Sequence, residues 1–114
     1  MLTVFIIARD WMLRAGVRAE LREKGIEALG MESLDDAAKA IATGQMLSAV
    51  VFEAGAGGTN PQALEQLARR VPVIVVASRW EPAPLESAAA VLYRPVRVGD
   101  VVARVLQALQ GHPA

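Results

Sequence analysis

The sequence predicts one α/β domain in which a parallel sheet of five strands lies between two layers of helices. Helical periodicity fills the intervals between short apolar runs rich in Val and Ile. These runs do not alternate with polar residues, as is typical of strands buried on both faces: Leu2–Ala8, Ala49–Phe52 and Val73–Ala77. The 114 residues suffice for one compact domain. We expect the domain at 1–110 and a flexible tail at 111–114.

The first helix is predicted by Leu13, Val17 and Leu21, which recur every four residues after the first strand. Gly25 is the expected C-terminal stop. A weaker strand is expected next, at Ile26–Gly30.

The second helix is expected to begin at Ser33, because Asp36 three residues later completes an acidic variant of the capping box. Its apolar face ends before Gly44 and consists of Leu34, Ala37, Ala38 and Ile41. The third helix is predicted by Asn60 as N-cap and Pro61 in the first turn. Its apolar residues are Leu64, Leu67 and Ala68.

The segment "SRWEPAPLESA" contains Pro82 and Pro84, and each proline disfavours helix at the residue before it. At most a shortened fourth helix fits, from about Leu85 to Ala89, before a strand at Ala90–Tyr93. The last helix is the clearest, because it carries a continuous apolar stripe of Val98, Val101, Val102, Val105, Leu106 and Leu109. Together these elements predict a (βα)5 three-layer sandwich.

Composition excludes several classes of function. The chain has no cysteine, and its single histidine, His112, lies in the expected tail, so thiolate chemistry and histidine-based metal sites are not predicted. Twelve basic residues balance twelve acidic ones, so neither nucleic acid nor an anionic membrane is expected to bind directly. No apolar run approaches the ~20 residues of a membrane span. The start resembles a buried strand and not a signal peptide. The absence of cysteine fits a cytoplasmic location best.

Sites in such sheets lie at the carboxyl ends of the strands. In this sequence those ends carry Arg9-Asp10-Trp11, Glu53-Ala54-Gly55, Ser78-Arg79-Trp80 and Arg94-Pro95. The glycine-rich loop after Glu53, "GAGGTN", matches neither G-x-x-x-x-G-K-[ST] nor G-x-G-x-x-G. We interpret it as a turn and not as a phosphate cradle.

Three segments resemble a response-regulator receiver domain, the chemotaxis-regulator type of flavodoxin-like fold. "VLYRPVRVGDVVARVLQAL" is similar to the family's last strand, basic-residue–proline pair and final helix, "SAVVFEAG" to the strand that ends at the phosphoacceptor aspartate, and "RVPVIVVAS" to the strand that carries a Thr or Ser. The resemblance implies a doubly wound sheet and a cis bond between Arg94 and Pro95.

The family's chemistry needs an acidic pair and the phosphoacceptor to hold Mg²⁺, and a lysine and a hydroxyl to contact the phosphoryl group. By the resemblance, the acidic pair falls on Ala8 and Arg9, with Asp10 one residue late, and the phosphoacceptor position carries Glu53. The remaining positions also differ from the family's pattern. Ala77 stands at the position of the hydroxyl, with Ser78 one residue late; Arg94 stands at that of the lysine, and Val91 at that of the aromatic switch residue. An arginine supplies no lone pair to a metal. We therefore expect no metal, no cofactor and no phosphotransfer.

One hypothesis is that Arg9, Arg94 or both pair with Glu53 and replace the metal–phosphoaspartate–lysine cluster by a permanent arrangement. The alternative is that Glu53 and both arginines are separately solvated, and the sequence leaves the two open.

Partner contacts are a second open question. Trp11 and Trp80, with Arg79 beside the latter, either anchor a protein partner or cover the top of the core. Arginines 14, 18 and 22 form a strip that is either solvated or docks an acidic partner. The shortened fourth helix alters the family's usual output and dimer face. It would uncover Leu85 and Leu92 and favour a different homodimer.

The sequence thus predicts a non-phosphorylatable pseudo-receiver, a protein-interaction module in bacterial signalling or transcription control and not an enzyme. Its partner would be a signalling or output protein, or an output domain of the same longer chain. The alternative is a sensor domain that binds an anion or nucleotide through Arg9, Arg79 and Arg94.

Overall fold

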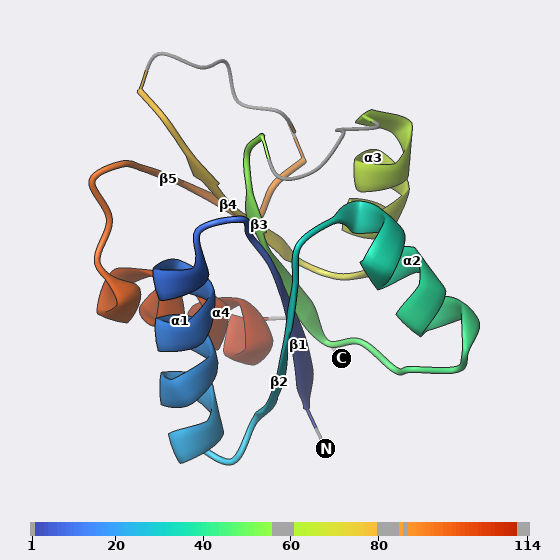
Figure 1. The fold of residues 1–114 in the computed structure, drawn as a ribbon, viewed down its shortest axis with the longest axis horizontal. Helices are drawn as coiled ribbons and strands as arrows, with labels where there is room; N and C mark the ends of the chain where they lie inside the picture. The colour runs from blue at the N-terminus through green and yellow to red at the C-terminus, as the bar shows by residue number, and fades with distance from the viewer. Residues whose placement is uncertain (1, 56–60, 80–84, 86, 112–114) are drawn as a thin grey trace.

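The five strands form one parallel sheet in the order β2-β1-β3-β4-β5 (Figure 1). The structure is a computed structural model, and it describes residues 2–55, 61–79, 85 and 87–111. The strands are β1 (Thr3–Ile7), β2 (Glu27–Met31), β3 (Ala49–Glu53), β4 (Val73–Ala77) and β5 (Ala90–Tyr93). The predicted fold class is confirmed. The predicted bounds of β4 and β5 are met to the residue.

Two helices cover each face of the sheet. Figure 1 shows α1 (Trp11–Glu23) and α4 (Val98–Gly111) on one side, and α2 (Leu34–Ala42) and α3 (Pro61–Arg70) on the other. The three central strands, β1, β3 and β4, are buried on both faces because their successive side chains enter opposite helical layers, whereas the edge strands β2 and β5 are partly exposed. In β1, Val4 and Ile6 pack in the core with α1 and α4, while Phe5 and Ile7 pack in the core with α2 and α3.

Local signals fix the ends of α1 and α2. Asp10 caps α1, and its carboxylate accepts from the N–H groups of Met12 and Leu13. Ser33 caps α2 by accepting from the N–H of Asp36 at 3.2 Å, as predicted. The loops after both helices contain a glycine with positive φ, at Gly25 and Gly44 (φ +78° and +94°), a conformation that glycine adopts without strain.

The connection from β4 to β5 differs from the prediction. Residues 87–89 form a turn and a bend and no helix, so the short helix expected from about Leu85 to Ala89 is not present in the described part of this connection. The expectation that Leu85 would be uncovered is also wrong. Its side chain is 2% exposed and packs in the core with α2 and α3, because without a helix the chain itself carries this leucine into the core. Leu92 packs against the other core.

The predicted stripe of the last helix is confirmed in α4. Val101, Val102 and Val105 are buried against the sheet, and Leu106 and Leu109 pack against the same core. Gly111, the first residue of the predicted tail, still belongs to α4. Asn60, the predicted N-cap of α3, and His112 lie outside the described residues.

Candidate functional site

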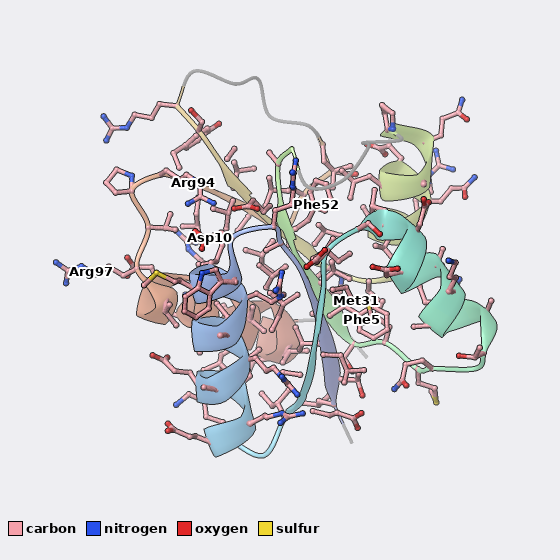
Figure 2. All side chains as sticks on the ribbon, viewed as in Figure 1. Phe5, Asp10, Met31, Phe52, Arg94 and Arg97 are labelled. Carbon is pink, nitrogen blue, oxygen red and sulfur yellow. The ribbon has the colours of Figure 1, made fainter. Side chains whose placement is uncertain are left out.

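A cluster of charged side chains lies at the carboxyl edge of the sheet, where β1, β3 and β5 end. Glu53 is the last residue of β3, Asp10 follows β1, and Arg94 follows β5. The three come together because parallel strands bring their carboxyl ends to the same edge. Figure 2 shows Asp10 and Arg94 next to one another at this edge.

The carboxylate of Glu53 is nearly enclosed, and both of its oxygens have partners. The side chain is 10% exposed. Its Oε1 accepts from the backbone N–H of Arg9 at 2.8 Å and from that of Asp10 at 3.2 Å. Its Oε2 pairs with Nη2 of Arg94. A buried carboxylate is tolerated when donors of this kind satisfy it.

The carboxylate of Asp10 makes two kinds of contact. Its Oδ1 caps α1 by accepting from the N–H groups of Met12 at 3.0 Å and Leu13 at 3.3 Å. Its Oδ2 lies 3.5 Å from Nη1 of Arg94. One carboxylate therefore starts α1 and joins the cluster.

Arg94 is the centre of the cluster, because one nitrogen of its guanidinium faces Glu53 and the other faces Asp10. The fixed fork of a guanidinium is suited to holding two carboxylates at once. Its backbone N–H donates to the carbonyl of Ala77 at 2.8 Å, which fixes the start of the side chain against the end of β4. The bond between Arg94 and Pro95 is cis, as the family resemblance implied.

The hypothesis of a paired Glu53 is thus confirmed for Arg94 and takes a different form for Arg9. Arg9 contacts Glu53 through its backbone N–H, while the residue is exposed and its side chain forms no ion pair with another described residue. The sequence pattern identified the right residue but not this contact, because every residue type except proline has a backbone N–H.

The cluster does not fit a Mg²⁺ ion. Mg²⁺ requires oxygen ligands in near-octahedral geometry. Each oxygen of Glu53 and Asp10 already faces an N–H or guanidinium donor, and Ala8, which is fully buried, offers no side-chain oxygen. In the described ranges no three His, Cys, Asp or Glu side chains gather in a way that would hold a metal ion.

The end of β4 contributes backbone more than side chain. Ala77 is 1% exposed, Ser78 is partly buried and Arg79 is exposed. Of the three arginines that an anion sensor would use, Arg94 is already paired with two carboxylates. An anion bound in the way that this alternative requires would have to compete with Glu53 and Asp10 for Arg94.

Trp11 does not cover the core. It is 67% exposed in the first turn of α1, as is the neighbouring Met12, which sequence reasoning missed. Trp80, the other predicted aromatic contact, lies outside the described residues. An exposed tryptophan beside an exposed methionine is a surface typical of protein contacts.

The three arginines predicted to form one strip on α1 differ in exposure. Arg18 and Arg22 are exposed, whereas Arg14 is partly buried and donates from Nη1 to the carbonyl of Ala8 at 2.6 Å. Arg14 also lies 3.9 Å from Glu32. The four-residue spacing could not reveal this role, because it depends on where β1 ends beside the helix.

Comparisons with solved structures place the fold. The receiver domain of the TMAO respiratory system response regulator TorR superposes with a TM-score of 0.83 at 18% identity, over 97% of this chain and 98% of that one. A response regulator receiver protein from Burkholderia phymatum gives 0.73 at 22% identity, over 100% and 98%. A receiver domain protein from Clostridium thermocellum gives 0.79 at 15% identity, over 97% and 96%. These likenesses show that the chain has the flavodoxin-like fold of receiver domains.

No protein-family model matches the chain, and no curated protein sequence does. Within the described helices, none is long and apolar enough to cross a membrane.

Proposed function

We propose that this receiver-fold domain is a pseudo-receiver, a regulatory protein-interaction module of bacterial signalling or transcription control that does not accept a phosphoryl group. The proposal rests on one observation: both oxygens of the Glu53 carboxylate already have partners, the side chain of Arg94 and the backbone N–H groups of Arg9 and Asp10. In the resemblance, Glu53 occupies the phosphoacceptor position. Here that carboxylate is already engaged on both oxygens.

The electrostatics of the cluster support this proposal. Phosphoryl transfer to a carboxylate requires positive charge that neutralises the incoming phosphoryl oxygens. The charged group nearest to Glu53 that could do so, the guanidinium of Arg94, is held between Glu53 and Asp10. A phosphoryl group would have to displace those carboxylates from the arginine, which the ion pairs oppose.

A pseudo-receiver of this kind acts by presenting one fixed surface. The cluster joins the ends of β1, β3 and β5, so it holds the carboxyl edge in one arrangement without a phosphorylation signal. Trp11 and Met12 are exposed beside this edge, as is Arg79 at the end of β4. We propose that Trp11 and Arg79 contact the protein partner, because aromatic and arginine side chains contribute most to such interfaces.

The test is incubation with acetyl phosphate and Mg²⁺, followed by intact-mass spectrometry. A receiver domain with an aspartate phosphoacceptor, treated in parallel, is the positive control. We expect that control to gain the mass of a phosphoryl group and this domain to keep its own mass. A gain of that mass by the wild-type domain would disprove the proposal.

Glu53→Asp tests whether the glutamate itself or the residues around it prevent phosphorylation. Aspartate restores the family's phosphoacceptor type, but Ala8 and Arg9 still offer no carboxylate for a metal. We therefore expect no labelling of this variant either. Labelling of Glu53→Asp alone would show that the single methylene, and not the rebuilt cluster, prevents phosphorylation.

A further inference from the structure

We propose that the groove between α2 and α3 is a dimer interface, at which this surface of one copy of the chain binds the same surface of a second copy. The inference is independent of the proposed function, because the groove lies on the outer surface of one helical layer and includes no residue of the Glu53 cluster. Figure 1 shows α2 and α3 side by side on the same face of the sheet.

The groove consists of two adjoining hollows of about 360 and 300 Å³, which share Ile41, Leu67 and Arg70. The larger one lies at the C-terminal ends of both helices and is also lined by Met46 and Val71. Apolar side chains make up most of the surface in both, so covering the groove removes apolar area from water.

Small side chains keep the groove open. Ala38 and Ala42 on α2 face Ala63 on α3 across the smaller hollow. Alanines allow another chain to approach the helix backbones closely. Ile41 is only partly buried at the base of the groove.

Met46 supplies a side chain that fits such a hollow. It is 84% exposed, the largest exposed fraction among the exposed large apolar side chains of the described residues, and it stands at the edge of the larger hollow. Methionine is flexible and fills irregular apolar gaps. In a dimer, Met46 of each copy reaches the apolar surface of the other.

The charges at the two ends of the groove favour a second copy as the occupant. Arg70, the last residue of α3, lines both hollows. Asp35, in the first turn of α2, lines neither, but it lies on the same side of the helix as the lining residue Ala38, three residues later. Both charged residues are exposed. Each α-helix follows a strand of a parallel sheet and runs back from its carboxyl edge, so the two residues lie at opposite ends of the groove. None of the three ion pairs among the described residues includes either of them.

A surface with an acid at one end and a base at the other is complementary to itself. A two-fold axis that runs across the groove between Asp35 and Arg70 brings each of them to the other type of residue on the second copy. The dimer then contains the Asp35–Arg70 contact twice. A partner of different sequence would need the same polarity by coincidence, whereas a second copy has it by symmetry.

The size of the surface predicts the strength of the dimer. The two helices contain 9 and 10 residues, which at ~1.5 Å per residue makes each about 14 Å long. A stable interface buries roughly 800 Å² per partner, which a groove of this length does not reach. We therefore expect a weak, reversible dimer that salt weakens further.

The test is sedimentation equilibrium over about 1 µM to 1 mM protein, with wild type, Asp35→Arg, Arg70→Glu and the double variant. We expect each single reversal to weaken dimerisation by at least about tenfold, because like charges then face each other twice. The double reversal restores opposite charges and should recover the wild-type constant.

Asp36→Arg and Arg69→Glu are matched controls. They place the same charge changes on the same two helices, at positions that helix geometry turns away from the face lining the groove. We expect both to dimerise as wild type does. Far-UV circular dichroism and thermal melting establish that each variant is folded.

Two results would overturn the inference. One is a wild-type domain that stays monomeric over the whole range of concentration. The other is a dimer that the reversals at residues 35 and 70 affect no more than those at 36 and 69, since it would use a different surface.

Discussion

Arg94 pairs with Glu53 across the end of β4, a strand that contains neither of the two residues. Glu53 ends β3 and Arg94 follows β5, and β4 lies between those strands in the sheet. The same guanidinium reaches Asp10, which follows β1 on the far side of β3. A single side chain therefore joins the ends of three strands, and substitutions in the cluster should lower stability measurably.

Glu53→Gln tests the charge on the enclosed carboxylate. The amide oxygen of glutamine still accepts from the N–H groups of Arg9 and Asp10, but its NH₂ group faces the guanidinium of Arg94, so two donors meet. We expect the free energy of unfolding in urea to fall by about 1–3 kcal/mol. Glu23→Gln, on the exposed end of α1, is the control and should change it by less than about 0.5 kcal/mol. Equal effects of the two changes would contradict a structural role for the Glu53 charge.

Arg94→Lys tests the fork of the guanidinium. Lysine keeps the positive charge, but one ammonium group cannot face Glu53 and Asp10 in the way that two separate nitrogens do. We expect a loss of about 0.5–1.5 kcal/mol in urea unfolding, less than for Arg94→Gln, which also removes the charge. Arg97→Lys provides the comparison, because Arg97 is exposed and points away from the cluster (Figure 2). If Arg94→Lys were as stable as wild type, the two-carboxylate contact would contribute nothing measurable.

Asp10 allows the helix cap to be separated from the ion pair. Asp10→Asn keeps an oxygen that caps α1 but removes the charge that faces Arg94, whereas Asp10→Ala removes both. We expect Asp10→Ala to lower the free energy of unfolding by about 1–2 kcal/mol. Asp10→Asn should lower it by under about 1 kcal/mol, because Asp10 and Arg94 are partly exposed. An asparagine variant as unstable as the alanine variant would mean that the ion pair outweighs the cap.

Gly16→Ala tests the close approach of α1 and α4. A Cβ atom at Gly16 would lie 2.7 Å from Cγ2 of Val98, so either the Val98 side chain or the packing of α1 on α4 has to shift. Alanine is the better helix former, yet we expect a net loss of about 1–2 kcal/mol from overpacking. Gly99→Ala is the control, since a Cβ atom there meets nothing within 4 Å. Adding Val98→Ala to Gly16→Ala should recover part of the loss, and no recovery would place the cause elsewhere.

Leu85→Ala tests whether the connection from β4 to β5 is part of the core. Leu85 is 2% exposed although it belongs to no helix or strand. We expect a loss of about 2–4 kcal/mol in urea unfolding, as for a buried leucine in a regular element. A value below about 1 kcal/mol would show that the connection detaches from the core at little cost.

The three central strands, β1, β3 and β4, were predictable because burial on both faces leaves a direct mark on the sequence. The edge strands β2 and β5 are partly exposed and leave a weaker mark, and β2 begins and ends one residue later than predicted. A strand that may contact only apolar neighbours must be apolar at every position, as in β4, and no other arrangement of a short run fits as well. Both ends of α2 and the C-terminal end of α1 were predictable for a similar reason, since glycine and the capping residue Ser33 act on their own neighbours, whereas the Asp10 cap of α1 was missed. The prediction of a helix near Leu85 was wrong, because a leucine beside small residues can be buried in the core without forming a helical turn.

The fold class, the order of elements and the edge of the sheet at which the charged residues gather all follow from the amino-acid sequence. Those features depend on local patterns and on the rule that parallel strands end together. The pairing of Arg94 with Glu53 and Asp10, the backbone contact of Arg9 and the exposure of Trp11 could be seen only in the folded chain. The contacts of Arg94 and Arg9 join residues about 40 or more positions apart, and no local pattern encodes a distance of that kind.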